Sequence, residues 1–391
     1  MDDLRKKWKE FLLFLIGCYS FISILQLSQF TTLFAVNTIL KGFQLVLLIV
    51  AAITILFVNR YTFKEWFAIG VIILTLVVSY YYSSDITLLF SFIILFSISE
   101  IEYKKTLKMV MIGQSLALFL TLFFYFANIL PDLVSYRNDG KPRHSLGFRH
   151  YLFLGDTFLT IVMAYVVTLK NNLEYWKYIF IFIIQLLIFY FTDGRTNTYL
   201  LFLFLIGIFF IQNDFISKNN NLKFNVLYFT NIIVTLSSMA LTFFLALTFN
   251  NMDSFILRLN SIFTGRPNLW NQYFSMYTPR LFGIEIYEVS NTSHEILSVG
   301  STYLVLDNSY LYLFFKFGII PFIIFLIYWY SMIRASKKFG TSELILIILI
   351  MSIYGITSQA MIFMSKNVVF FFSSILFKHF FYDNYSKGVE N

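Results

Sequence analysis

The sequence of 391 residues contains little charge, because Asp, Glu, Lys and Arg together make up only 13% of it. Soluble globular proteins carry roughly 25% charged residues. Hydrophobic residues make up 58% of the chain and aromatic residues 21%. Apolar surface in this amount has to be buried in protein or in lipid. The composition therefore excludes a water-soluble protein and a disordered one, and it predicts an integral membrane protein.

Cysteine, proline and the common enzyme motifs are also scarce. The single cysteine, Cys18, leaves no intrachain disulfide and no cysteine-based metal cluster. The sequence has no P-loop, no dinucleotide-binding glycine pattern, no His-Glu-x-x-His zinc helix and no Asp-x-Asp pair in a predicted external loop. We therefore expect no cofactor, no bound metal, no nucleotide substrate and no nucleic-acid partner.

Long apolar segments dominate what remains. A transmembrane helix needs about 20 mostly apolar residues. Twelve segments approach this length: 11–27, 39–58, 66–82, 86–99, 107–130, 151–170, 176–192, 197–212, 225–249, 309–331, 343–364 and 367–382. The fourth is short, and its length fits a re-entrant or tilted segment equally well. The sequence predicts an all-α polytopic membrane protein with about 12 transmembrane helices, forming one integral membrane domain over residues 1–391.

The distribution of basic residues predicts the orientation. Most of the 29 lysines and arginines fall on the inner side if both termini are cytoplasmic, as the positive-inside rule requires. The first span follows a basic Arg5-Lys6-Lys7 run and lacks a small-residue cleavage site, so it is expected to stay as an anchor. We expect a multi-pass protein of the cytoplasmic membrane with both termini inside.

Arginine and lysine are distributed differently in this topology. Seven of the ten arginines fall outside, but only two of the nineteen lysines do, Lys141 and Lys366. A guanidinium group is suited to bidentate contact with phosphate or carboxylate. The external arginines therefore indicate an anionic ligand; the alternative is that they pair with external acids or remain solvated.

Two predicted external loops are long, residues 131–150 and residues 250–308, and long loops in compact proteins are usually functional. The larger loop contains an amphipathic pattern between Pro267 and Pro279, which predicts a surface helix. Gly265 and Arg266 stand at its N-terminus, where free amides and the helix dipole favour an anion. The alternative is a packed lid with Arg266 at its solvated edge.

Ionisable residues inside predicted spans supply a second indication, because their burial is costly unless they face a partner or a wet cavity. Lys41, Asp156 and Lys316 all fall in the outer halves of their spans. They predict a polar cavity that opens outward. Snorkelling of Lys41, and pairing of Lys316 with Asp156, are the alternatives. Further candidates near the mouth of this cavity are the acids Asp307 and Glu295 and the bases His144, His150 and His294.

Four local signatures carry a family resemblance. They are Ser145-Leu-Gly-Phe-Arg-His150, Asp193-Gly-Arg-Thr196, Phe263-Thr-Gly-Arg-x-x-Leu-Trp270, and Asp307-Asn-Ser-Tyr-Leu311 leading into Phe317-Gly-Ile-Ile-Pro321. In this order, with about a dozen spans and two enlarged external loops, the sequence resembles Wzy-type polymerases of capsule, O-antigen and exopolysaccharide repeat units, which are related to the O-antigen ligases. This resemblance implies a GT-C-like fold.

The resemblance also implies an activity. Such polymerases join undecaprenyl-pyrophosphate-linked oligosaccharides on the outer face of the bacterial cytoplasmic membrane, without a metal. Chain-length regulators and flippases are their possible partners. Carried over by position, the residues that contact pyrophosphate or glycan are Arg149, Arg195 and Arg266, with Arg143, Arg258 and Arg280 in support. Lys316 and Asp156 are added to this predicted binding set because they fall in the predicted polar cavity, independently of the resemblance.

The resemblance also suggests a general base. O-antigen ligases have a histidine where this sequence has Asp307, and this departure favours a polymerase. Asp307 is therefore the first candidate for the base and His294 the second. Alternatively, Asp307-Asn308 simply caps the following helix. A lipid-linked oligosaccharide flippase and a ligase remain the rival functions; a flippase is expected to spread polar residues along a central passage.

Overall fold

The computed structural model describes residues 2–137, 140–169, 172–213, 215, 219–249, 253–288 and 304–377. Its helices are α1 (Asp2–Gln26), α2 (Phe30–Leu33), α3 (Val36–Ile53), α4 (Phe63–Ser83), α5 (Thr87–Ser97), α6 (Tyr103–Phe126), α7 (Tyr151–Thr168), α8 (Tyr175–Thr192), α9 (Arg195–Gln212), α10 (Asn220–Thr248), α11 (Ser254–Ile262), α12 (Arg266–Met276), α13 (Ser309–Tyr312), α14 (Ile319–Lys338), α15 (Ser342–Tyr354) and α16 (Ser373–Phe377). Two short π-helices are η1 (Thr54–Val58) and η3 (Leu313–Phe317), and a short 3-10 helix is η4 (Val368–Phe372).

Nine of the described helices are long and apolar enough to cross a membrane. They are α1, α3 with its π-helical continuation η1, α4, α6, α7, α8, α9, α10 and α14. Each has at least 18 residues, which at 1.5 Å per residue reaches about 27 Å. The chain is therefore an all-α polytopic membrane protein, and this part of the prediction is confirmed.

The other predicted spans differ from simple transmembrane helices. As far as they are described, the segments predicted at 86–99, 343–364 and 367–382 have shorter apolar helices, Thr87–Ser97, Ser342–Tyr354 and Val368–Phe377. The segment predicted as one helix over 309–331 is divided: α13 and η3 end at Phe317, and α14 begins at Ile319. The prediction of one continuous helix there is wrong.

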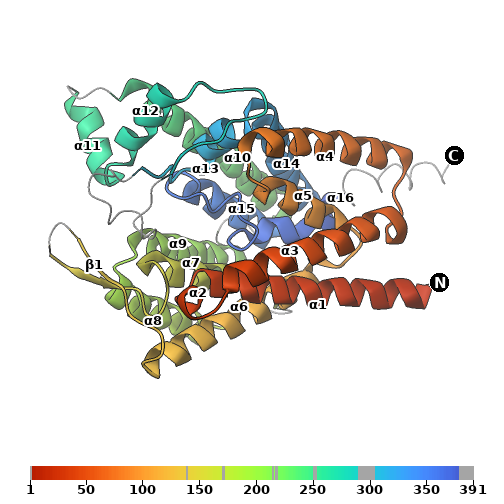
Figure 1. Ribbon diagram of the computed structural model, residues 1–391, viewed down its shortest axis with the longest axis horizontal. Coiled ribbons are helices and arrows are strands. Elements are labelled where there is room, and N and C mark those ends of the chain that lie inside the picture. The colour runs from red at the N-terminus through yellow and green to blue at the C-terminus, as the bar shows by residue number, and fades with distance from the viewer. Residues whose placement is uncertain are drawn as a thin grey trace.

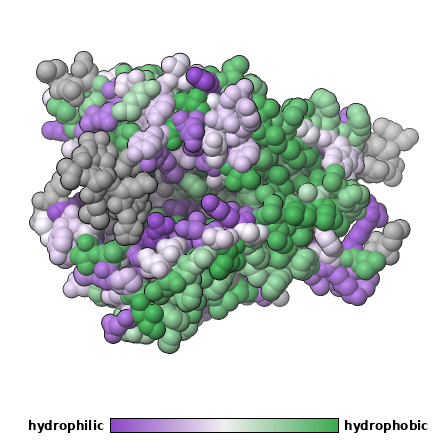
Figure 2. Space-filling model, viewed as in Figure 1, coloured by the Kyte–Doolittle hydropathy of each residue, from purple (hydrophilic) through white to green (hydrophobic). Residues whose placement is uncertain are grey.

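Two ends of the molecule can be distinguished in Figure 1. The strands β1 (Val134–Tyr136) and β2 (Pro142–His144) form an antiparallel hairpin at the left, on the same side as α11 and α12. We call this the hairpin end. The start of α1 and the connection from α3 to α4 lie at the right, which we call the amino-terminal end. In Figure 2, hydrophilic residues gather around a hollow near the hairpin end, and a broad hydrophobic zone lies to its right.

The division at Gly318 is stabilised by a strap of backbone from the large loop. Ile319 N donates to Arg280 O and Ile320 N to Leu281 O, each at 3.0 Å. Gly318 has φ of 99°, and a Cβ atom there would lie 2.2 Å from Gly283 N. Only glycine permits both this left-handed conformation and this approach. Hydropathy does not show the break because Phe317 and Ile319, on either side of Gly318, are both apolar.

A second irregular segment, residues 355–367, connects α15 to η4. Backbone polar groups within a membrane protein have to find protein partners. Here Asn308 Nδ2 donates to Ile356 O at 2.8 Å, and Ser309 Oγ donates to Ser358 O at 2.6 Å. Asn367 Nδ2 donates to Met361 O at 2.6 Å. The segment is therefore held in a fixed shape by side chains from the start of α13 and from its own end.

Candidate functional site

A cavity of about 140 Å³ lies where α7, α9 and α12 approach the segment 355–367. It is lined by His150, Leu152, Phe153, Asp156, Thr196, Asn197, Arg266, Asp307, Tyr354, Thr357, Ser358 and Lys366. Three of the predicted site residues, Asp156, Arg266 and Asp307, are thus brought together from distant parts of the sequence. Most of the other side chains in the lining are polar or ionisable.

Asp156 and Lys366 form a buried ion pair in this cavity. Lys366 Nζ lies 2.9 Å from Asp156 Oδ2, and Tyr354 donates its hydroxyl proton to Oδ1 of the same carboxylate. The Asp156 side chain is 5% exposed and that of Lys366 17%. Lys366 Nζ also lies 4.9 Å from the centroid of the Phe153 ring. The alternative that Lys316 pairs with Asp156 is wrong, because Lys366 occupies that place.

Arg266 reaches across the mouth of the cavity to Asp307. Its Nη2 lies 3.7 Å from Asp307 Oδ2, and its Nη1 donates to Thr264 Oγ1 at 2.8 Å. The Arg266 Nε atom is buried and meets no hydrogen-bond acceptor among the described residues. Arg266 is the first residue of α12, as the sequence predicted within one position. The guanidinium group therefore keeps one donor without an acceptor among the described residues.

His150 caps α7 and borders the same cavity. Its Nδ1 accepts a hydrogen bond from Leu152 N at 3.3 Å. Burial is the main cause that lowers the pKa of His150, to about 4. The Asp156 carboxylate raises this pKa, whereas the charges of Lys366 and Arg266 lower it further. The ring is therefore neutral at neutral pH. Because Nδ1 accepts, Nε2 carries the proton, and His150 is a hydrogen-bond donor rather than a base.

A cluster of cations surrounds Asp193 beside the cavity. Asp193 ends α8 with a left-handed φ of 48°, and its side chain is 1% exposed. Arg137 Nη1 contacts Oδ2, Lys141 Nζ lies 3.1 Å from Oδ1, and the Nε atoms of Arg143 and Arg195 lie 3.7 Å and 3.9 Å from the carboxylate. Burial opposes ionisation, but the Lys141 hydrogen bond and the other cations lower the pKa of Asp193.

This cluster joins two sequence signatures. Arg143 lies on the hairpin of the first long loop, and Arg195 is the first residue of α9. The Arg143 guanidinium stacks over the Tyr151 ring at 4.6 Å and donates to its hydroxyl at 2.7 Å. Tyr151 follows His150, and Thr196 after Arg195 lines the cavity. The cations therefore stand next to the cavity, and Arg143 contributes to lowering the pKa of His150.

The Ser145–His150 signature is mainly structural. Phe148 is fully buried, and Arg149 N donates to Leu27 O at 2.9 Å, which attaches the loop to the chain after α1. Asp132 Oδ1 accepts from Ser145 N at 2.8 Å, and His144 Nδ1 lies 2.6 Å from Asp132 Oδ2. The half-buried Arg149 is not among the residues that line the cavity.

Other predicted residues lie away from the cavity or outside the described chain. Arg258 on α11 and Arg280 after α12 are exposed. Lys316 belongs to η3, where its carbonyl accepts from Ile284 N at 3.2 Å. His294 lies outside the described residues. Lys41 is exposed on α3, in keeping with the snorkelling alternative.

Glu288 is a carboxylate that sequence reasoning did not select. Its Oε1 accepts from Leu306 N at 2.9 Å and from Gln359 Nε2 at 3.1 Å, so it joins the end of the large loop to the segment 355–367. Burial raises the pKa of Glu288, and the nearby Asp307 carboxylate adds to this rise. Glu288 therefore positions the backbone next to Asp307.

Comparison with known proteins gives no match to any family model, curated protein or solved structure. Within the described residues, no group of three or more His, Cys, Asp or Glu side chains is arranged to hold a metal ion. The chemistry available in the cavity is that of its own side chains. They are the cations Arg266 and Lys366, the neutral hydrogen-bond donor His150, and the carboxylates Asp156 and Asp307.

Proposed function

We propose that this protein is a Wzy-type polysaccharide polymerase that joins lipid-pyrophosphate-linked oligosaccharide repeat units. The observation that carries the proposal is the meeting of Arg266 and Asp307 in a cavity whose other wall presents Lys366 and His150. Glycosyl transfer from a lipid pyrophosphate needs charge stabilisation on the departing diphosphate and a base for the acceptor hydroxyl. This cavity supplies both kinds of group side by side.

In the proposed reaction, the bond between the donor sugar's anomeric carbon and the diphosphate oxygen breaks, and its electron pair leaves with the diphosphate. Arg266 and Lys366 offset the charge that develops there, and His150 Nε2 donates a hydrogen bond to it. The acceptor hydroxyl oxygen forms the new bond to the anomeric carbon, and its proton passes to Asp307. Asp156 and Tyr354 act as positioning residues that hold the Lys366 ammonium in place.

We propose a matching topology. The hairpin end faces the outside of the bacterial cytoplasmic membrane and the amino-terminal end faces the cytoplasm, with both termini inside. The nine long helices together with α5, α15 and the η4–α16 unit make the twelve membrane segments, in a GT-C-like arrangement. The substrate is an undecaprenyl-pyrophosphate-linked oligosaccharide, and a chain-length regulator and a flippase are the proposed partners.

A lipid-linked oligosaccharide flippase is the second candidate, because a larger cavity of about 1140 Å³ opens at the amino-terminal end. An alternating-access passage would have to connect the two ends. Between them lies a fully buried aromatic core that includes Phe325, Trp329 and Phe370. This packing favours a polymerase, with chemistry confined to the hairpin end. An O-antigen-type ligase would use the same cavity with a different acceptor.

The decisive experiment uses the purified full chain in lipid nanodiscs and a lipid-pyrophosphate-linked repeat unit, without added nucleotide. A polymerase yields a ladder of products on the lipid carrier. Arg266→Ala should slow ladder formation by about 10²–10³, so that single repeat units persist. Arg258→Ala is the matched control, because this arginine lies in the same loop but is exposed on α11. Wild-type elongation by Arg266→Ala would refute the assignment, and transbilayer transport without elongation would favour the flippase.

A further inference from the structure

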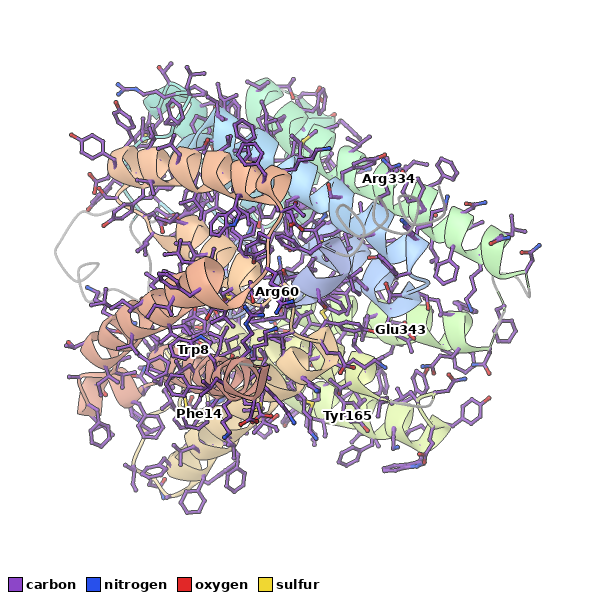
Figure 3. The ribbon with its side chains drawn as sticks, turned by 90° about the vertical axis from the view of Figure 1, so that its right-hand side faces the viewer. Trp8, Phe14, Arg60, Tyr165, Arg334 and Glu343 are labelled. Carbon is purple, nitrogen blue, oxygen red and sulfur yellow. The ribbon has the colours of Figure 1, made fainter. Side chains whose placement is uncertain are left out.

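A second polar cavity, of about 1140 Å³, opens at the amino-terminal end of the molecule. Figure 3 looks onto this end and shows Arg60 near its centre. The walls come from α1, α4, α6, the end of α14 and α16. The ionisable side chains in the lining are the cations Arg5, Lys6, Lys9, Arg60 and Lys105 and the acids Glu10, Glu65, Glu100 and Glu102.

Two of these acids are already occupied. Glu100 accepts from Lys9 Nζ and from the backbone amide of Arg60, both at 2.6 Å. Glu65 is committed to the capping box that starts α4 at Thr62. Within the described chain, no hydrogen bond or ion pair engages the charged groups of Arg5, Lys6, Arg60 and Lys105, which face only Glu10 and Glu102 as remaining acids. With five cations and four carboxylates, the lining has a formal net charge of +1, and four of its cationic groups keep donors for a ligand.

An apolar groove of about 270 Å³ continues from this cavity into the helix bundle. It runs between α4, α5, α14 and α16, and it shares the side chains of Glu65 and Phe377 with the polar cavity. Its walls are almost entirely hydrocarbon, from residues such as Ile69, Ile72 and Ile327. A polar cationic cavity that continues into an apolar groove fits a ligand with an anionic head and a hydrocarbon tail.

Tyr328 gives an independent indication of a missing partner. Its side chain lines the groove, the residue is 5% exposed, and its hydroxyl has no hydrogen-bond partner among the described residues. A buried hydroxyl without a partner is destabilising, and such groups in native proteins usually meet a ligand or water. A groove filled only by a hydrocarbon chain would not satisfy it, whereas a ligand with an ester carbonyl would.

We propose that the two cavities together bind one anionic phospholipid. The phosphate contacts Arg60 and Lys105, an ester carbonyl accepts from Tyr328, and one acyl chain fills the groove. Basic pockets between membrane helices are recognised sites for anionic headgroups, and burial of the acyl chain supplies the apolar part of the affinity. This site lies at the opposite end from the proposed active site, and the inference does not rest on the proposed function.

The test uses the purified full chain in detergent micelles, titrated with dioleoyl phosphatidylglycerol and followed by native mass spectrometry. The double variant Arg60→Gln, Lys105→Gln should bind at least tenfold more weakly than the wild type. The matched control is Lys64→Gln, Lys108→Gln, which removes two exposed cations that lie outside the cavity, each within four residues of its counterpart in the chain. This control should stay within twofold of the wild type.

The groove is tested by a second pair of variants on α4. Ala68→Phe places a ring in the groove and should weaken phosphatidylglycerol binding at least tenfold, whereas Val71→Phe, on the exposed side of the helix, should not. Equal losses in the lysine control would show general surface attraction and overturn the proposal. So would unchanged binding by Ala68→Phe, or equal binding of phosphatidylethanolamine by the wild type.

Discussion

Lys366 Nζ lies 2.9 Å from the carboxylate of Asp156, and this contact joins the irregular segment before η4 to the second turn of α7. The two residues are 210 positions apart in the chain. Both are largely buried, so each neutralises a charge that the membrane interior would otherwise oppose. The pair therefore fixes one wall of the proposed active site and also presents a cation to it.

Removal of the Lys366 charge should destabilise the protein. Lys366→Met leaves the Asp156 carboxylate buried without its cation, and breaking a buried pair in this way costs about 3–5 kcal/mol. We expect a lower melting temperature in detergent and no chain elongation. The double variant Asp156→Asn, Lys366→Met should recover most of the stability but none of the activity. Wild-type stability of Lys366→Met alone would contradict the ion pair.

Arg266→Lys should impair elongation, although it keeps the positive charge. A lysine lacks the planar fork that binds two oxygen atoms of a diphosphate at once. We expect product formation to fall by a factor of roughly 10 or more, and by about 10²–10³ for Arg266→Ala, as for the loss of other charge-stabilising donors. The measurement is the initial rate of ladder formation. Full activity with lysine would show that charge alone is sufficient.

Asp307→Asn should separate substrate binding from turnover. The amide keeps the shape of the side chain but cannot take the proton from the acceptor hydroxyl, and loss of a general base typically costs about 10²–10⁴ in rate. Binding of the lipid-linked substrate, measured by native mass spectrometry, should remain within a few-fold. Retained turnover would assign the base to another group, either Glu288 or His294.

His150 should make the stability dependent on pH. Its pKa is lowered from 6.5 to about 4 on folding, so the folded protein disfavours the protonated form. The stabilisation is complete above about pH 6.5 and is lost as the pH falls toward 4, in total on the order of 3 kcal/mol. His150→Asn should keep the cap to Leu152 N without titrating. If the melting temperatures of the wild type and of His150→Asn changed with pH in the same way between pH 4 and 7, the buried position of the His150 ring would be contradicted.

Asp193→Asn should loosen the cation cluster beside the cavity. The carboxylate that gathers Arg137, Lys141, Arg143 and Arg195 becomes neutral, and the cations repel one another. We expect a loss of about 2 kcal/mol, less than for a fully buried pair because the partners are partly exposed. Added pyrophosphate should raise the melting temperature of this variant more than that of the wild type. Glu285→Gln, an exposed acid in the large loop, is the control.

Hydropathy predicted the long helices because a span of about 20 apolar residues leaves a clear signal. It could not predict the break at Gly318, because the residues on both sides of this glycine are apolar. The early end of α15 at Tyr354 did leave a signal, because Thr357, Ser358 and Gln359 interrupt the apolar run, but their number was too small to divide the predicted span. Tertiary contacts from Asn308 and Ser309 decide its path.

The candidate site was predicted in part. Charge and loop length selected Arg266, Asp307 and Asp156, which do line one cavity. Lys366 was missed, although it is one of only two lysines in the predicted external regions and this imbalance was a usable signal. Tyr354 carried no signal at all, because tyrosine is common in this sequence, with 26 copies. The grouping of Arg143 with Arg195 depends on how α7 and α8 pack.

The backbone strap between Arg280 and Ile284 has a consequence for turnover. Four hydrogen bonds tie this stretch to η3 and the start of α14, and the contact between Gly283 and Gly318 leaves no space for a side chain. The part of the large loop that directly follows α12 is thus anchored to the helix bundle. We therefore expect that any opening for the proposed glycan substrate takes place on the α11 side of the loop, away from this anchor.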